Sequence, residues 1–274
     1  MSTFDIEFAA VTDIGKIREK NEDSVLISSE LGLGVVADGM GGHSAGEIAS
    51  NIAVHVLEET IRKVNNGALK MPDNFLPKLD KIERKLLMAA NLANAAIYTT
   101  AQASVVYKMM GTTLTGVTFD GDNAVAVHVG DSRIYLYRDK KLVQVTTDHS
   151  LAMEHVRRGL LTKAEADKSK IQNVLTRAMG IKKNVEFDLL KFPVKIGDVM
   201  VLCSDGLYKG LTEKQMQELL EKGQNTPLVK LCKQLVRVSN DNDGQDNIST
   251  VMIKILPAKP LTLTQKIKRF FGKS

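Results

Sequence analysis

Three apolar segments of the sequence each run into an aspartate that stands beside a glycine, at residues 35–39, 127–131 and 201–206. Short apolar runs that end at turn residues are typical of buried strands. One Asp-Gly pair after a strand is most simply a turn signal. Because the same apolar run precedes the aspartate in all three segments, the pattern predicts strands that bring acidic side chains together at one end of a sheet sandwich.

The rest of the periodicity predicts many short strands and a few helices. The predicted strands cover residues 4–12, 24–28, 31–37, 112–119, 124–129, 134–137, 142–145, 185–192, 199–203 and 248–255. The predicted helices cover residues 45–64, with Ser44 as the cap, and then 79–105, 212–222 and 227–239. Antiparallel strands with helices grouped in pairs favour an α+β sandwich over a doubly wound parallel sheet.

Composition narrows the class of protein. The chain has 274 residues, 43% hydrophobic and 25% charged, which is the mixture of an ordinary soluble globular protein. No apolar run approaches the roughly 20 residues that cross a bilayer. Two cysteines, Cys203 and Cys232, make neither a disulfide framework nor a four-thiolate metal site. With no basic and apolar leader at the N-terminus, we expect a cytoplasmic location.

The net charge of +5 is concentrated at the C-terminus. Residues 256–274 hold five basic side chains and no acidic ones, so the body of the chain is formally neutral and no nucleic-acid partner is expected. We expect one domain at 1–256 and a basic tail at 257–274. The tail residues 259–274 have an amphipathic pattern, which suits weak contact with an anionic membrane or a partner. Docking on the body and fraying remain open alternatives.

Further acidic residues extend the set at the strand ends. Asp246 precedes the last predicted strand, and Glu22 and Asp23 precede an earlier one. Carboxylates this close would repel one another strongly unless cations neutralise them. Ligands that are all oxygen suit Mg²⁺ or Mn²⁺ better than zinc.

Six motifs occur in the order typical of one enzyme family. They are REKNED at 18–23, DGMGGH at 38–43, GTT at 111–113, GDSR at 130–133, SDGL at 204–207 and DNIS at 246–249. Over residues 4–256 the chain resembles the metal-dependent protein phosphatases (PPM, type 2C), and most of all their compact bacterial branch. The resemblance implies a four-layer α/β/β/α sandwich of two antiparallel sheets flanked by helix pairs, with the metal site at one end.

The resemblance also implies a set of metal ligands for two or three Mn²⁺ or Mg²⁺ ions. Asp38 would bridge two ions, Asp205 and Asp246 would complete the first, and the Gly39 carbonyl would join the second. Asp131 with Asp205 would hold a third ion. Asp38, Asp205 and Asp246 are therefore the expected catalytic residues.

Other residues are expected to support the reaction in the family's manner. Arg18 would bind the substrate phosphate, Glu22 and Asp23 would orient metal-bound waters, and Asn247 would support the ligands from behind. The implied reaction is hydrolysis of phosphoserine or phosphothreonine in proteins by a metal-bridged hydroxide, with no covalent phosphoenzyme. Phosphoprotein substrates and a cognate serine/threonine kinase are the expected partners.

One motif departs from the eukaryotic pattern. Met40 stands where eukaryotic members have a histidine proposed as the general acid, and His43 is more simply a residue that positions the helix start. Residues 150–175 correspond to a variable flap in the family, where Arg157 and Arg158 either meet acidic substrates or face solvent. Two rival functions remain: a phosphoprotein-binding pseudophosphatase and another two-metal hydrolase such as a phosphodiesterase.

Overall fold

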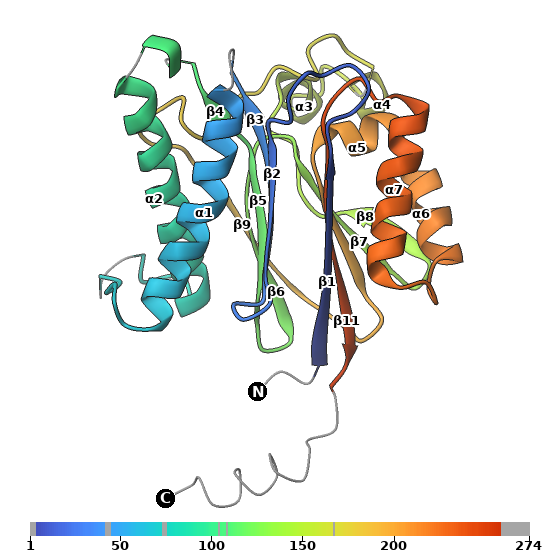
Figure 1. The fold of residues 1–274 in the computed structure, drawn as a ribbon, viewed down its shortest axis with the longest axis horizontal. Coiled ribbons are helices and arrows are strands. Elements are labelled where there is room, and N and C mark those ends of the chain that lie inside the picture. Colours follow the sequence, from blue (N-terminus) through green and yellow to red (C-terminus); the bar gives the residue numbers. More distant parts are fainter. Residues whose placement is uncertain are drawn as a thin grey trace, which may run out of the picture.

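Two antiparallel β-sheets lie face to face at the centre of the computed structural model, which describes residues 4–41, 45–72, 76–103, 105–107, 109–166 and 168–258 (Figure 1). The five-stranded sheet has the order β1 (Phe4–Asp13), β11 (Ile248–Pro257), β10 (Val199–Cys203), β7 (Arg133–Arg138) and β8 (Lys141–Gln144). The six-stranded sheet has the order β2 (Asp23–Ser28), β3 (Leu33–Met40), β5 (Leu114–Asp120), β6 (Asn123–Val129) and β9 (Asp188–Pro193), with β4 (Gly111–Thr112) beside β3.

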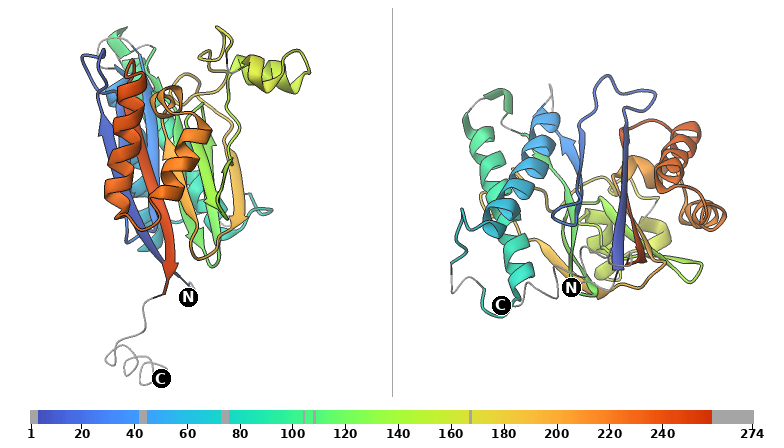
Figure 2. Two further views of the ribbon diagram at one scale, coloured as in Figure 1. Left: turned by 90° about the vertical axis from the view of Figure 1, so that its right-hand side faces the viewer. Right: turned by 60° about the horizontal axis from the view of Figure 1, so that its bottom comes forward.

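Helices cover the outer face of each sheet (Figure 1). Helices α1 (Ala45–Asn65) and α2 (Lys81–Ala103) pack on the six-stranded sheet, and α6 (Glu213–Lys222) and α7 (Leu228–Asn242) pack on the five-stranded sheet. The short elements are η1 (Val105–Tyr107), α3 (Leu151–Arg157), α4 (Lys163–Ala166) and α5 (Asp205–Gly210). Figure 2 shows that α3 and α4 project away from the sheets at one end. The predicted four-layer α+β sandwich is confirmed.

Three apolar clusters fill the spaces between the four layers. Successive side chains of β3 point to opposite faces of the sheet, and both faces are buried, which explains why its sequence is a continuous apolar run. Val35 and Ala37 face the α1–α2 layer while Val36 faces the other sheet, and all three side chains are fully buried. A strand that is buried on both faces has no polar side to display. The strand β10 repeats this arrangement between α7 and the six-stranded sheet.

Several element boundaries differ by one to three residues from the sequence-based prediction, and two of the differences have a clear physical cause. The predicted helix 79–105 begins at Lys81, because Asp80 caps it: its Oδ1 accepts hydrogen bonds from the backbone N–H groups of Ile82 and Glu83, both at 2.9 Å. The predicted strand 185–192 begins at Asp188, which is paired with His128 near the end of β6. The pairing with β6 ends at this residue.

Some predictions fall outside the described residues. The Ser44 cap, His43 and the tail at 259–274 belong to this group, so their expected roles stay predictions. Within the described ranges, no helix combines the length and apolar character needed to span a membrane.

Candidate active site

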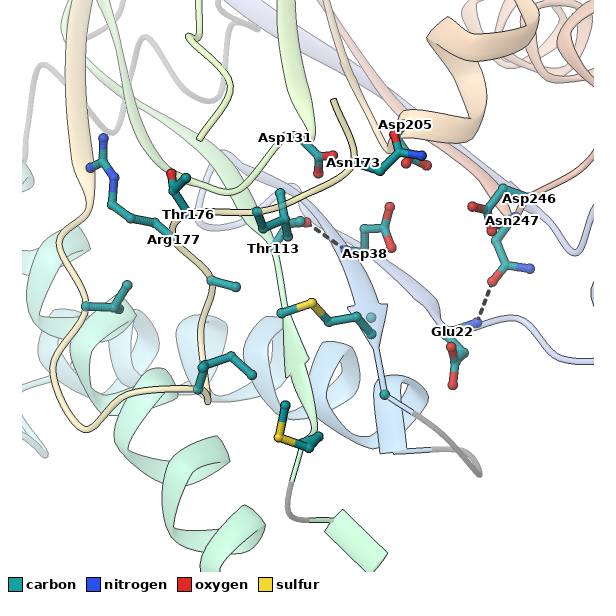
Figure 3. A pocket seen from close by; sticks show the side chains of 18 of the residues that line it. Glu22, Asp38, Thr113, Asp131, Asn173, Thr176, Arg177, Asp205, Asp246 and Asn247 are labelled. Atoms are coloured by element: carbon teal, nitrogen blue, oxygen red, sulfur yellow. Dashed lines mark hydrogen bonds between the residues drawn. The ribbon is translucent and has the colours of Figure 1, made fainter. Parts of the chain in front are cut away.

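A cavity of about 780 Å³ lies at the end of the sandwich where β3 and β10 finish and β11 begins, at the top of Figure 1. Its acidic lining residues are Glu22, Asp38, Asp131, Glu186, Asp205 and Asp246. Arg18, Gly39 and Asn247 also line it. All the predicted site residues except Asp23 therefore line one cavity, although they come from five separate segments of the sequence. Figure 3 shows the Asp38, Asp131, Asp205 and Asp246 carboxylates on neighbouring walls of this cavity.

Asp38 stands at the end of β3, where its backbone is held on both sides. Its N–H donates to the Thr113 hydroxyl at 2.9 Å, as Figure 3 shows, and its carbonyl accepts from the Thr112 hydroxyl and the Thr113 N–H, each at 2.9 Å. The Thr113 hydroxyl is also 2.7 Å from that of Ser132. The motifs at 111–113 and 130–133 therefore fix the position of Asp38.

Gly39 is a glycine because backbone surrounds it. A Cβ atom built there would lie 2.2 Å from the Gly46 carbonyl oxygen and 2.4 Å from the Glu22 carbonyl oxygen. The Gly39 N–H donates to the same Glu22 oxygen at 3.1 Å. This packing joins the end of β3, the first turn of α1 and the loop before β2 in one compact unit.

Asp205 is the first residue of α5, and only Ser204 separates it from the end of β10. Its Oδ2 accepts a hydrogen bond from the Lys209 ammonium, one helical turn along α5. Its Oδ1 is buried and has no hydrogen-bond partner among the described residues. Asp23 lies deeper and does not line the cavity; its Oδ2 accepts from the Ser204 hydroxyl at 2.7 Å.

Asp246 is paired with Arg18 through two contacts. The Arg18 Nε is 2.9 Å from Oδ1, and the Nη2 donates to Oδ2 at 3.0 Å. About half of the Arg18 side chain is exposed, so the guanidinium lies at the rim of the cavity. The planar fork of arginine is matched here to a carboxylate, and the same geometry fits two oxygens of a phosphate.

Asn247 holds the loop that carries Arg18 and Glu22. Its side-chain oxygen accepts from the Glu22 N–H at 2.8 Å, and its amide nitrogen donates to the carbonyls of Ile14 and Lys20, both at 2.9 Å. Figure 3 shows the first of these bonds. Asn247 itself is 5% exposed. It is thus placed to fix the loop, and the support of the metal ligands expected of it stays a prediction.

Burial and then electrostatic repulsion raise the pKa values of the acidic wall. Burial, followed by the charges of Asp23, Asp205, Asp131 and Asp246, raises the pKa of Asp38 well above its usual value. Burial and the charges of Asp205 and Asp148 raise the pKa of Asp131 to about 8, although Lys209 opposes this shift. The pKa of Asp205 is also raised, by burial first. The wall therefore holds more negative charge than its neighbours neutralise.

Such a wall suits small divalent cations. The donors are carboxylate and carbonyl oxygens, which Mg²⁺ and Mn²⁺ prefer, and the unpartnered Oδ1 of Asp205 is free to bind one. In the described part of the chain, no group of three or more His, Cys, Asp and Glu side chains is arranged to hold one ion. Asp205 and Asp246 are instead paired with Lys209 and Arg18.

Another part of the cavity lining was mostly not predicted from the sequence. It includes Asn173, Thr176, Arg177, Lys182 and Glu186. These residues lie in the irregular chain between α4 and β9, mostly beyond the flap expected at 150–175. The flap arginines at 157 and 158 do not line the cavity, and the second pairs with Glu154 at 3.7 Å.

Lys209 is the other residue that sequence reasoning missed. Its spacing of four residues from Asp205 would have revealed it, because residues four apart share a helix face. The prediction treated residues 205–206 as a turn and expected no helix there. Burial lowers the pKa of Lys209, but Asp205, Asp246 and Asp131 together raise it above its usual value, so the side chain is a cation.

Residues 18–252 match the family model of protein phosphatase 2C. The chain belongs to this family. It is 34% identical over 246 residues to the serine/threonine phosphatase Stp of Listeria monocytogenes, covering 89% of this chain and 93% of the relative. It is 30% identical over 253 residues to protein phosphatase PhpP of Streptococcus pneumoniae, covering 91% of this chain and 98% of the relative.

Solved phosphatase structures have the same fold. The serine/threonine phosphatase PstP/Ppp of Mycobacterium tuberculosis superposes with a TM-score of 0.80 at 32% identity, over 92% of this chain and 99% of that one. The PstP catalytic domain in complex with two manganese ions gives 0.76 at 31% identity, over 93% and 100%. The predictions of the family, the sandwich fold and a protein serine/threonine phosphatase are confirmed.

Proposed function

We propose that this phosphatase removes phosphate from phosphoserine and phosphothreonine by direct attack of water, with two divalent cations at the acidic wall. The observation that carries the proposal is the meeting of Asp38, Asp205 and Asp246 with Arg18 at one cavity. The two manganese ions of the PstP catalytic domain support the number and type of cation. Phosphoprotein substrates follow from the family.

The proposed ligands divide between the two cations. Asp38, Asp205, Asp246 and the Gly39 carbonyl would hold them, with Asp205 and Asp246 on one side of Asp38 and Gly39 next to it in the sequence. Bound there, the pair of cations supplies a water that is nucleophilic at neutral pH and neutralises charge on the phosphate. The raised pKa values of Asp38 and Asp205 are the physical reason to expect cations: positive charge relieves the repulsion that burial makes costly.

The chain's own residues bind and orient the substrate. The Arg18 guanidinium, half exposed at the rim, presents two N–H groups to two phosphate oxygens, which a lysine would not do in this paired geometry. Asn247 keeps this arginine in place through the loop backbone, and Glu22 accompanies it along the cavity wall. We assign the orientation of water to Glu22, which lines the cavity, and to Asp23, which lies deeper.

Protonation of the leaving oxygen has no protein donor in this proposal. Met40 lines the cavity at the position of the eukaryotic histidine, and a thioether has no proton to give. We assign the protonation of the departing serine or threonine oxygen to water in the cavity.

We further infer the setting of the reaction. Residues 1–256 form the phosphatase domain, and a serine/threonine kinase that acts on the same proteins is the natural opposing enzyme. Both cysteines are free and buried, which agrees with a reducing, cytoplasmic compartment. Contact of the 259–274 tail with a membrane or a partner is tested by deleting it and measuring liposome association.

The deciding experiment is phosphate release from a phosphothreonine peptide with Mn²⁺, with EDTA, and with the Asp205→Asn variant. We expect activity that requires Mn²⁺, is abolished by EDTA, and falls roughly 100-fold or more in the variant, since a cation ligand contributes several kcal/mol. Asp241→Asn, an exposed position on α7, is the control and should keep full activity. No turnover with any metal, together with retained binding of the peptide, would make the chain a phosphoprotein-binding pseudophosphatase.

A further inference from the structure

The Lys209 ammonium lies between the acidic residues of the cavity wall. It donates to Oδ2 of Asp205, and it is close enough to Asp131 and Asp246 to interact electrostatically with both carboxylates. One quarter of its side chain is exposed, and this part lines the cavity. A positive charge that belongs to the protein is therefore already present among the acidic side chains that cations are expected to bind.

The position of α5 relative to Asp131 is fixed by several contacts. The Tyr208 hydroxyl donates to the Asp131 carbonyl at 3.2 Å, and the Arg133 guanidinium carbon lies 3.6 Å from the centre of the Tyr208 ring. On the other side of α5, the Ser239 hydroxyl contacts the carbonyls of Gly206 and Leu207 at 2.8 and 3.0 Å. The helix cannot withdraw Lys209 from the Asp131–Asp205 region without breaking these contacts.

The charges at this place do not favour a further cation. Asp131 and Asp205 are the pair that the family resemblance assigned to a third ion. Lys209 supplies a positive charge in direct contact with Asp205, and a divalent ion bound by the same carboxylate would face that ammonium. Repulsion between such close charges is large wherever water is partly excluded. A third ion is therefore disfavoured here, unlike the two ions at Asp38.

We propose that the Lys209 ammonium takes the place of a third divalent cation between Asp131 and Asp205, so that this phosphatase binds two divalent cations per chain. The inference rests on the proposed two-cation function. The positive charge next to Asp131 and Asp205 then does not depend on the metal concentration, because the ammonium is part of a side chain of α5.

The test counts manganese ions bound per chain in the absence of substrate, by calorimetric titration and by the signal of free Mn²⁺ in electron paramagnetic resonance. We expect two ions for the wild type, three for Lys209→Met and Lys209→Gln, and two for Lys209→Arg, which keeps the charge. Lys182→Met is the matched control, because it removes a lysine from the same cavity but leaves the Asp205 partner in place. It should bind two ions.

Three ions on the wild type, or two on both neutral variants, would overturn the inference while leaving the phosphatase activity intact. Absence of Mn²⁺ binding and of phosphate release in the wild type would instead remove the proposed function itself. Anomalous diffraction from crystals soaked in Mn²⁺ gives an independent count that needs no variant. Two peaks near Asp38, with the Lys209 Nζ still bonded to Asp205, would support the inference, and a peak between Asp131 and Asp205 would refute it.

Discussion

At the scale of single residues, the cavity depends on side chains that bind backbone. Asn247 makes three hydrogen bonds to the loop of Arg18 and Glu22, and it is nearly fully buried. Thr113, between β4 and β5, does the same for Asp38 in the neighbouring strand β3. The acidic residues were readily predicted from their motifs, whereas these supporting contacts depend on which backbone groups the fold brings within reach.

The Asn247→Ala variant should lose both stability and activity. Removing the side chain leaves the buried Glu22 N–H without its partner, so we expect the free energy of unfolding to fall by about 2–3 kcal/mol. The looser Arg18 should lower kcat/KM for a phosphopeptide. Urea denaturation and steady-state kinetics measure the two effects. The neighbour Gln245 is exposed and donates to Asp243, so Gln245→Ala should change stability by less than about 0.5 kcal/mol. Equal losses in both variants would contradict this role for Asn247.

At the scale of elements, the approach of β3 to α1 leaves no room for a side chain at Gly39. A methyl group there would overlap the carbonyl oxygens of Gly46 and Glu22 at 2.2 and 2.4 Å, so Gly39→Ala must push strand, helix and loop apart. We expect the free energy of unfolding to fall by about 3 kcal/mol or more, with weaker Mn²⁺ binding in calorimetry. Gly116→Ala in β5 is the matched control.

The control differs from Gly39 only in the space around it. A Cβ at Gly116 would meet its nearest neighbours, Leu57 and Val127, at 3.5 Å, which is ordinary contact. Its unfolding free energy should change by less than about 1 kcal/mol. If Gly39→Ala proved as mild as Gly116→Ala, the tight packing of β3 against α1 would not be needed for the site.

Most elements could be predicted from the sequence because each carries its own periodicity. The apolar runs of β3 and β10 are continuous since both faces of each strand are buried, and α7 shows its single apolar face. The short helix α5 could not be predicted, because two glycines within Asp205–Gly210 look like a turn. The cavity wall at residues 173–186 also escaped prediction, since only tertiary placement brings an irregular segment beside Asp38.

At the scale of the whole molecule, buried acidic groups make stability depend on pH. Burial first, and then the charges of Asp205 and its neighbours, raises the pKa of Asp23 to about 7 and that of Asp131 to about 8. Both groups have a value of 3.8 in an unfolded chain. The folded state therefore retains protons that the unfolded state has lost, and its stability decreases as pH rises through this range.

For the protein in EDTA, we expect the free energy of unfolding to fall by about 1–2 kcal/mol between pH 7 and 8.5. Urea denaturation across this range measures it. The range avoids the opposite effect of His128, whose pKa is lowered by burial to about 3 and which costs stability only below about pH 6.5. Asp23→Asn, a variant behind the cavity wall, should flatten the decrease near pH 7. A slope identical to that of the wild type would show that Asp23 does not carry it.

The acidic side chains also belong to different layers of the sandwich. Asp38 ends a strand of the six-stranded sheet, while Asp205 and Asp246 border β10 and β11 of the five-stranded sheet. A cation held as proposed by Asp38 and Asp205 would therefore be a cross-link between the sheets, at the end where their shared apolar core stops. Removing it frees the two sheets to separate at that end. The metal ions of the reaction would then also stabilise the packing of the two sheets. In the metal-free phosphatase, local unfolding would begin at the active site.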